Sequence, residues 1–274
     1  MLQKSGRTLR LTIKPATLAL AIVSVVTPWH IAIADTNLPS LPEAVSQHVV
    51  LQTTVRGKKY VASFGGATGS SDQLRPHNKA WQLTEGNAVW QPLPAIPSVA
   101  RLSGRMAATG VTMGNNFFIF TGQSKTAQGA DVTVQDSYRF SPMTQTYTKL
   151  PDMPVPVSAS LAVAYQNRYI YLVSGQHQDG AINLVQLFDN FSQKWSQATP
   201  YPGSPVFGHA GAIVNNQLLV CDGQTQSFAT QTSGQAQIES SCFIGTIDPK
   251  AAHRIAWQKI PHHGMAARYQ QTAL

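Results

Sequence analysis

One structural plan recurs four times along the chain, and this internal repeat constrains the fold more than any other feature. Each copy contains an apolar segment that ends in Gly-Gly or Gly-Gln, a variable loop, a second apolar segment, a short turn and an aromatic residue. The aromatic residues lie about 50 residues apart, at Trp90, Tyr147, Trp195 and Trp257. A repeated unit of this size must stack on its neighbours because it cannot bury its apolar surface alone.

Tight turns indicate that the repeated segments are antiparallel strands. Each glycine-ending segment follows another apolar segment, and residues such as Gly114-Asn115 and Asn215-Asn216 join the two. Gly and Asn tolerate the positive φ that hairpin turns require. Charged residues make up 12% of the chain, about half the usual share, which favours short strands over helices. Each unit is therefore predicted to be a four-stranded meander.

Radial stacking of such meanders produces a β-propeller, in which aromatic side chains fill the space between sheets. The repeat resembles the Kelch family over roughly residues 48–274. The first unit has the Gly65-Gly66 pair, and the other three have Gly-Gln at the aligned place. The resemblance implies an all-β Kelch-type propeller over residues 35–274, with blades at approximately residues 48–97, 104–154, 157–202 and 207–261.

The last residues of the sequence align with the start of the second unit. Arg268 falls on Arg105 and Leu274 falls on Val111, so we expect residues 265–274 to form the first strand of a fifth blade. Two further blades complete a six-bladed ring, so the sequence predicts an incomplete six-bladed propeller. A compact four-bladed protein with a C-terminal strand tail is the alternative.

Residues 1–34 have the pattern of a secretory signal peptide. A basic start with no acidic residue precedes the apolar run from Thr17 to Val26, and Ala32-Ile33-Ala34 supplies small residues for cleavage before Asp35. An uncleaved membrane anchor is the alternative, but the run is short for a span of about 20 residues. We expect a periplasmic or secreted protein with no membrane span after cleavage.

The positive charge of the chain does not indicate a nucleic-acid partner. The net charge is +8 at pH 7, and the predicted signal peptide carries four of the basic residues and no acidic one. The remaining excess is mild and is not clustered, as a nucleic-acid footprint would be.

Two cysteines, Cys221 and Cys242, are predicted to lie late in one strand and early in the next. In an exported protein such a pair is a disulfide candidate, and two buried thiols are the alternative. His262 and His263 are adjacent, and neighbouring side chains on an extended chain point apart. We therefore predict no metal site, and the sequence contains no cofactor motif.

The starts of the innermost strands are expected to ring the central channel of a propeller. Alignment of these starts sets Phe207 level with Arg105, and His209 level with Ala107. An arginine there offers a planar fork to a carboxylate. The alternative is structural, with Arg105 tying blades together and His209 bonded to a turn. The polar candidates at the channel mouth are Arg105, His209, Arg268 and Gln270.

The long loops between the second and third strands supply further candidates on the same face. Arg75 and His77 are predicted to bind substrate, and Glu239 is a candidate acid or base. Other loop charges, such as Asp136, are predicted to be solvated.

The mouth arginines, the signal peptide and the Leu-Pro-x-Leu-Pro connectors look like those of bacterial N-acetylneuraminate mutarotases, which are Kelch propellers. That resemblance implies a sugar isomerase in which His209 or Glu239 moves the proton and Arg105 or Arg268 holds the sugar carboxylate. Neither cysteine lies where a copper oxidase similar to galactose oxidase needs it. The alternative is a non-catalytic module that binds a glycan or a protein of the cell envelope.

Overall fold

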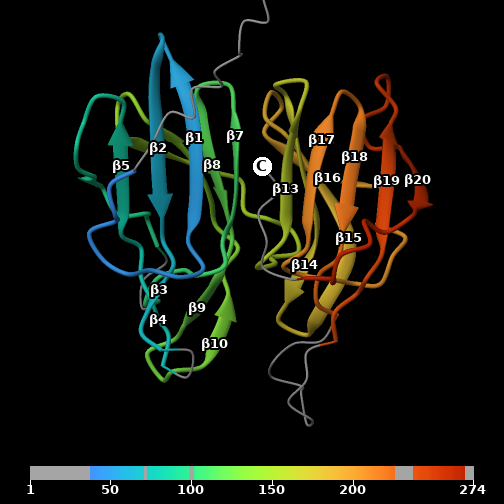
Figure 1. Cartoon of the computed structure of the whole chain (residues 1–274), viewed down its shortest axis with the longest axis horizontal. Coiled ribbons are helices and arrows are strands. Elements are labelled where there is room, and N and C mark those ends of the chain that lie inside the picture. The colour runs from blue at the N-terminus through green and yellow to red at the C-terminus, as the bar shows by residue number, and fades with distance from the viewer. Residues whose placement is uncertain (1–37, 71–72, 99–101, 226–236, 269–274) are drawn as a thin grey trace, which may run out of the picture. The chain divides into compact units, whose positions relative to one another are not determined.

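The computed structural model describes residues 38–70, 73–98, 102–225 and 237–268. All of its strands belong to one compact unit, residues 39–274. The described residues form four four-stranded antiparallel sheets arranged as a β-propeller, which we call the first to fourth blades (Figure 1). The all-β prediction is confirmed. The described part of the chain contains no helix of the length and apolarity that a membrane crossing requires.

The four blades follow one another along the chain (Figure 1). The first contains β1 (Val49–Val55), β2 (Lys58–Phe64), β5 (Ala80–Thr84) and β6 (Gln91–Leu93). The second contains β7 (Thr109–Met113), β8 (Asn116–Phe120), β11 (Ser137–Ser141) and β12 (Thr146–Leu150). The third contains β13 (Leu161–Tyr165), β14 (Tyr169–His177), β15 (Gly180–Asp189) and β16 (Lys194–Ala198). The fourth contains β17 (Ala210–Val214), β18 (Gln217–Cys221), β19 (Cys242–Ile247) and β20 (Ile255–Ile260).

Two small hairpins extend the loops of the first two blades. Strand β3 (Ala67–Thr68) pairs with β4 (Arg75–Pro76), and β9 (Gln123–Lys125) pairs with β10 (Asp131–Thr133). The fifth-blade strand expected over residues 265–274 falls largely outside the described residues, and residues 265–268 are not in a strand. The expected signal peptide, residues 1–34, also lies outside them.

The innermost strands neighbour one another in chain order, β1 against β7, β7 against β13 and β13 against β17. A chain of backbone hydrogen bonds links the residues just before these strands. The amide of Ala107 donates to Gln47, that of Ala159 to Ala107, and that of Gly208 to Ala159, at 2.7–2.8 Å. The blades are thus joined at the channel by main-chain bonds that do not depend on side-chain identity.

Aromatic side chains fill the space between blades, as the repeat predicted. The ring centroid of Phe64 in the first blade lies 5.2 Å from that of Phe140 in the second. Between the second and third blades, Phe120 lies 5.7 Å from Trp195. The buried hydroxyl of Tyr171 donates to the Ala252 carbonyl, which links the third blade to the fourth at 2.6 Å.

The repeated aromatic residue also bonds each blade to the connector that precedes it. The indole N–H of Trp195 donates to the Pro151 carbonyl at 3.0 Å, and Tyr147 Oη donates to Pro94 at 3.1 Å. Trp90 and Trp257 make the matching bonds, to Pro39 at 2.7 Å and Thr199 at 3.3 Å. A polar tip on a large apolar ring suits this half-buried position, because the ring packs while the tip satisfies a carbonyl.

In the structure, the glycine motif of the first blade matches those of the other three blades with an offset of one residue from the match expected from the sequence. At the matching place in the four blades, Gly66, Gly122, Gly175 and Gly223 have φ of 101–122°. The place before them has φ of 48–64° and holds Gly65, Thr121, Ser174 and Asp222. Only glycine adopts the first range readily, whereas the left-handed region near 55° admits other residues. The units therefore differ in the first residue of the pair, not in the second as the Gly-Gln alignment implied.

Candidate functional site

Arg105 lies inside the second blade instead of at a channel mouth. Its side chain is 1% exposed, and its Nη2 donates to the Asp136 carboxylate at 2.8 Å. Its guanidinium also donates to the carbonyls of Thr121, Asp136 and Pro97 at 3.0–3.3 Å. Asp136, expected as a solvated loop charge, is 2% exposed. Burial of either charge is tolerable because each neutralises the other.

His209 is also buried, at 4% exposed. Burial lowers its pKa to about 4, and the nearby Val173 backbone opposes this shift only in part. The imidazole is therefore neutral near pH 7. The chain of backbone bonds shows that Gly208, not His209, matches Ala107 and Ala159. Likewise Val206, not Phe207, matches Arg105, since Gly175 donates to the Val206 carbonyl as Gly66 does to Arg105.

The structure brings three candidates together around Gly223. The Glu239 amide donates to the Gly223 carbonyl at 2.8 Å, and the Gly223 amide donates to the Arg268 carbonyl at 3.1 Å. His209 borders the same glycine from inside the blade. Arg268 therefore relates to the fourth blade as Arg105 relates to the first, but its side chain is exposed. Gln270 lies outside the described residues.

Arg75 and His77 belong to the loop of the first blade, away from Gly223. Arg75 is exposed at the β3–β4 hairpin. His77 Nε2 lies 3.8 Å from Glu43, whose carboxylate also accepts from Lys79 Nζ at 2.7 Å. Burial lowers the pKa of His77, and the Glu43 charge opposes that shift. The predicted substrate-binding residues therefore do not form one cluster.

Cys221 and Cys242 are joined by a disulfide. They pair directly across β18 and β19, and Cys242 also pairs with Ile260 of β20. The bridge therefore fixes one end of the fourth blade.

The adjacent histidines do not point apart as expected. The Nε2 atoms of His262 and His263 lie 2.7 and 3.1 Å from the two oxygens of the Asp222 carboxylate. Their ring centroids are 3.8 Å apart. The chain bends at Gly264, where φ is +78°, so these residues are not on an extended strand.

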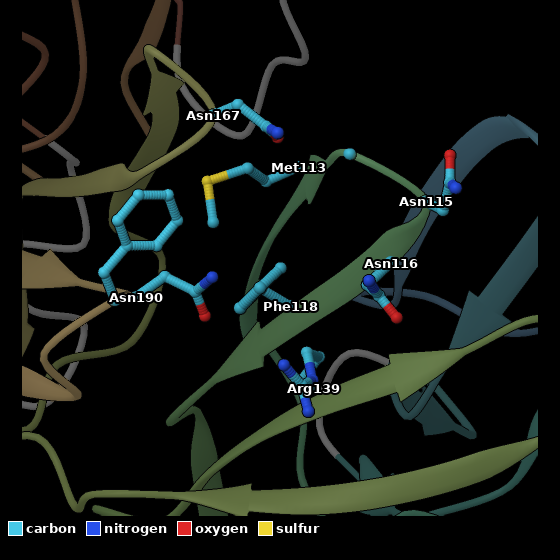
Figure 2. Close-up of a pocket in the computed structure, with 9 residues that line it drawn as sticks. Met113, Asn115, Asn116, Phe118, Arg139, Asn167 and Asn190 are labelled. Atoms are coloured by element: carbon cyan, nitrogen blue, oxygen red, sulfur yellow. The ribbon is translucent and has the colours of Figure 1, made fainter.

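A pocket of about 330 Å³ opens between the second and third blades, at the end where the β7–β8 and β13–β14 turns lie. Its floor contains the buried side chains of Met113 and Phe118. Figure 2 shows Asn116 and Arg139 of the second blade and Asn167 of the third around it. Its remaining lining residues are Gly114, Asn115, Asn190 and Phe191.

Phe191 is held in place although its side chain is 70% exposed. The Arg168 guanidinium lies 5.4 Å from the centre of its ring. Two hydrogen bonds to the Asp189 carboxylate, at 3.0 and 2.7 Å, orient Arg168 and hold the pKa of Asp189 well below its usual range. The aromatic ring at the rim of the pocket is therefore already positioned. A ligand that packs against it would cause little further loss of side-chain conformational entropy.

Curated relatives share the repeat over half of the chain. Kelch-like protein 15 from Gallus gallus is 30% identical over 137 residues, which cover 50% of this chain and 27% of that protein. Kelch-like protein 33 from Homo sapiens is 26% identical over 144 residues, which cover 52% and 26%. The chain spans about a quarter of the length of these relatives. No family model matches the chain.

A solved structure of YjhT has the same fold. It matches with a TM-score of 0.65 over 84% of this chain and 68% of that chain, at 16% sequence identity. The chain is a Kelch-repeat β-propeller. The repeat and fold predicted for this propeller are confirmed, whereas the narrower resemblance to sugar mutarotases stays a prediction.

The sequence of the propeller did not predict this pocket. The sequence argument took Asn115 only as a residue that permits a tight turn, although the amides of asparagines in such turns can also face a ligand. Phe191 is the residue from which the pocket could have been suspected. It is a large apolar residue between two polar residues in a turn, where it has no core to pack against. Its proximity to Asn116, 75 positions away, follows from blade stacking and could not be read from spacing.

Proposed function

We propose that this propeller is a non-catalytic module that binds a carbohydrate in the pocket between the second and third blades. The observation that carries the proposal is the combination of four asparagine side chains, one arginine and one exposed aromatic ring around a single opening. A volume of about 330 Å³ fits a small ligand or one sugar unit of a glycan.

The chemistry of the lining matches that of a sugar. Each asparagine amide supplies donors and acceptors, which suits hydroxyl groups that are both. The ring of Phe191 offers a flat apolar surface to the C–H face of a pyranose. Arg139 is the charged residue of the described lining, and it suits a neutral or an acidic sugar better than a basic one.

Binding without catalysis is favoured over mutarotation by the burial of His209, an expected acid or base, and of Arg105, an expected carboxylate ligand. Anomer exchange requires an acid or base within reach of the anomeric oxygen. His209 is 4% exposed and Arg105 is 1% exposed, so neither side chain reaches solvent as a sugar-contacting group must. Glu239 remains partly exposed, but it lies in a different blade from the pocket.

The test is calorimetric titration of the whole chain with a panel of neutral and acidic sugars. We expect Phe191→Ala and Asn116→Ala each to weaken binding at least tenfold. Met143→Ala is the matched control, because Met143 occupies the same place in the β11–β12 turn and is also exposed, but lies outside the pocket lining. Absence of sugar binding, or equal binding by all variants, overturns the proposal. Anomer exchange above the spontaneous rate overturns its non-catalytic part.

The same proposal includes export to the periplasm or the exterior, where glycans and envelope proteins are available. It rests on the signal-peptide pattern of residues 1–34. Sequencing of the exported protein is expected to begin at Asp35. A protein retained at its full length inside the cell contradicts this part.

A further inference from the structure

The register of strands β18, β19 and β20 places three potential metal ligands at one end of the fourth blade. Cys221, Cys242 and Ile260 form one row across β18, β19 and β20. Asp222 lies one residue beyond this row on its strand, and His262 lies two beyond on its own. Neighbouring strands are about 4.8 Å apart, so imidazoles that turn back across β19 reach the carboxylate.

The carboxylate of Asp222 is held inside the protein while the imidazoles are open to solvent. The side chain of Asp222 is 5% exposed, and those of His262 and His263 are 20% and 33% exposed. The Asp222 amide donates to the Ser241 carbonyl at 3.0 Å, and the disulfide clamps the adjacent residue. One ligand is therefore fixed, and the other two can adjust.

We propose that Asp222, His262 and His263 bind a divalent transition-metal ion of the Zn²⁺ class. One ligand atom from each of the three residues lies within 4.8 Å of the other two, and the Nε2 atoms are the ones that face the carboxylate. Ligand atoms around tetrahedral Zn²⁺ are about 3.3 Å apart, given bonds of about 2.0–2.1 Å. The present N–O separations, 2.7 Å to one Asp222 oxygen and 3.1 Å to the other, are shorter than this by about 0.6 and about 0.2 Å, so the exposed imidazoles need to move by only that much.

The donor set selects the class of ion. Imidazole nitrogen suits Zn²⁺, Cu²⁺ and Ni²⁺, whereas Mg²⁺ and Ca²⁺ require a shell of oxygen ligands. Three protein ligands leave one position of a tetrahedral ion for water or an external ligand. The nearby cysteines do not compete, because both sulfurs are in the disulfide.

Binding requires a proton to move on His263. The Met265 amide donates to His263 Nδ1 at 3.2 Å, so in the metal-free protein the ring carries its proton on Nε2. The ion needs the Nε2 lone pair, so the proton passes to Nδ1 and the Met265 bond is lost. The Nε2 proton of His262 must likewise pass to Nδ1, so metal binding replaces the two N–H···O contacts with Asp222 as well as the Met265 bond.

The experiment is calorimetric titration of the tag-free, chelator-treated full chain with ZnCl₂, and with MgCl₂ as the ion control. We expect one Zn²⁺ per chain and no saturable Mg²⁺ binding. His262→Gln and His263→Gln are each expected to weaken Zn²⁺ binding at least tenfold. His253→Gln, an exposed histidine between β19 and β20 of the same blade, is the matched control and should bind as the natural protein does.

Two results overturn the proposal. One is the absence of saturable Zn²⁺ binding, and the other is unchanged binding by both His262→Gln and His263→Gln. Asp222→Asn tests the third ligand and should also lose binding. Because this variant alters a buried group, its folding is checked by circular dichroism, and the two histidine variants decide the question if it does not fold.

Discussion

The second and fourth blades each bury a basic side chain at the same end, Arg105 and His209, and they do so in opposite ways. Arg105 keeps its charge because the Asp136 carboxylate lies 2.8 Å away. His209 has no such partner, and burial lowers its pKa to about 4, so it is neutral. The difference illustrates the two ways in which a basic group is buried. It is either paired with a countercharge or deprotonated.

The ends of the second and third strands are also joined by different bonds in these two blades. In the second blade Ser137 of β11 pairs with Phe120 of β8, and Arg105 bridges the residues beyond them. In the fourth blade the matching pair is Cys221 and Cys242, joined covalently. The disulfide leaves the carboxylate of Asp222 free of any buried countercharge among the described residues, so that carboxylate accepts from exposed histidines instead.

The largest expected effect comes from breaking the ion pair of the second blade. Arg105→Ala leaves the Asp136 carboxylate buried without its partner, which should lower the free energy of unfolding by about 3–5 kcal/mol. Urea denaturation measures this. Lys149→Ala, which breaks an exposed 3.2 Å pair with Asp152, is the control and should cost less than about 1 kcal/mol. Equal costs for the two variants contradict the structural role of Arg105.

Removal of the disulfide is expected to have the next largest effect. The bridge closes a loop with a sequence separation of 21, so the Cys221→Ala, Cys242→Ala double variant should lose about 3 kcal/mol. A reducing agent should destabilise the natural protein similarly and leave the double variant unchanged. A natural protein whose denaturation curve does not respond to reduction is inconsistent with a bridge that stabilises this blade.

The neutral His209 predicts that the folded protein loses stability as pH falls. The unfolded chain takes up a proton on this imidazole near pH 6.5, and the folded protein does so only near pH 4. Protons therefore favour unfolding, by about 2 kcal/mol between pH 7 and pH 5. His209→Ser, which introduces the residue of the third blade at this place, should remove that part of the pH dependence. Identical pH profiles of the two proteins contradict the prediction.

The smallest effect is expected from a bond that every blade repeats. Trp195→Phe removes the indole N–H that donates to Pro151 but keeps a ring against Phe120 and Phe188, so it should cost about 1 kcal/mol. Chemical denaturation measures the cost. A loss as large as that of Arg105→Ala means that the repeated bonds, and not the unique buried groups, dominate the stability of the blades.

The local structure was largely predictable from the sequence. Strand β8 ends at Phe120 just before its glycine motif, and β14 runs from Tyr169 into its own motif, as the apolar segments indicated. The turn at Asn215 has φ of 55°, in agreement with the hairpin argument. These features depend on residues a few positions apart, so short-range spacing contains the information.

The candidate site was not predictable in the same way. The alignment misplaced His209 by one residue because it lacked the backbone bond from Gly208 to Ala159 that sets the level. It also treated His262 and His263 as parts of an extended chain, whereas the bend after them turns both rings toward Asp222, which lies 40 and 41 positions earlier. Charge and polarity identified these residues as unusual but not where their side chains would lie.

The sequence by itself determined the repeat, the strands and their turns, because a strand, a hairpin and a left-handed glycine depend on the φ preferences and apolar spacing of nearby residues. Tertiary structure alone decided which polar side chains are buried and which are open to solvent. Arg105 meets Asp136 across 31 residues, and Asn116 and Phe191 share a pocket only because two blades stack. Such contacts join segments far apart in the chain, and their geometry exists only after the sheets have packed.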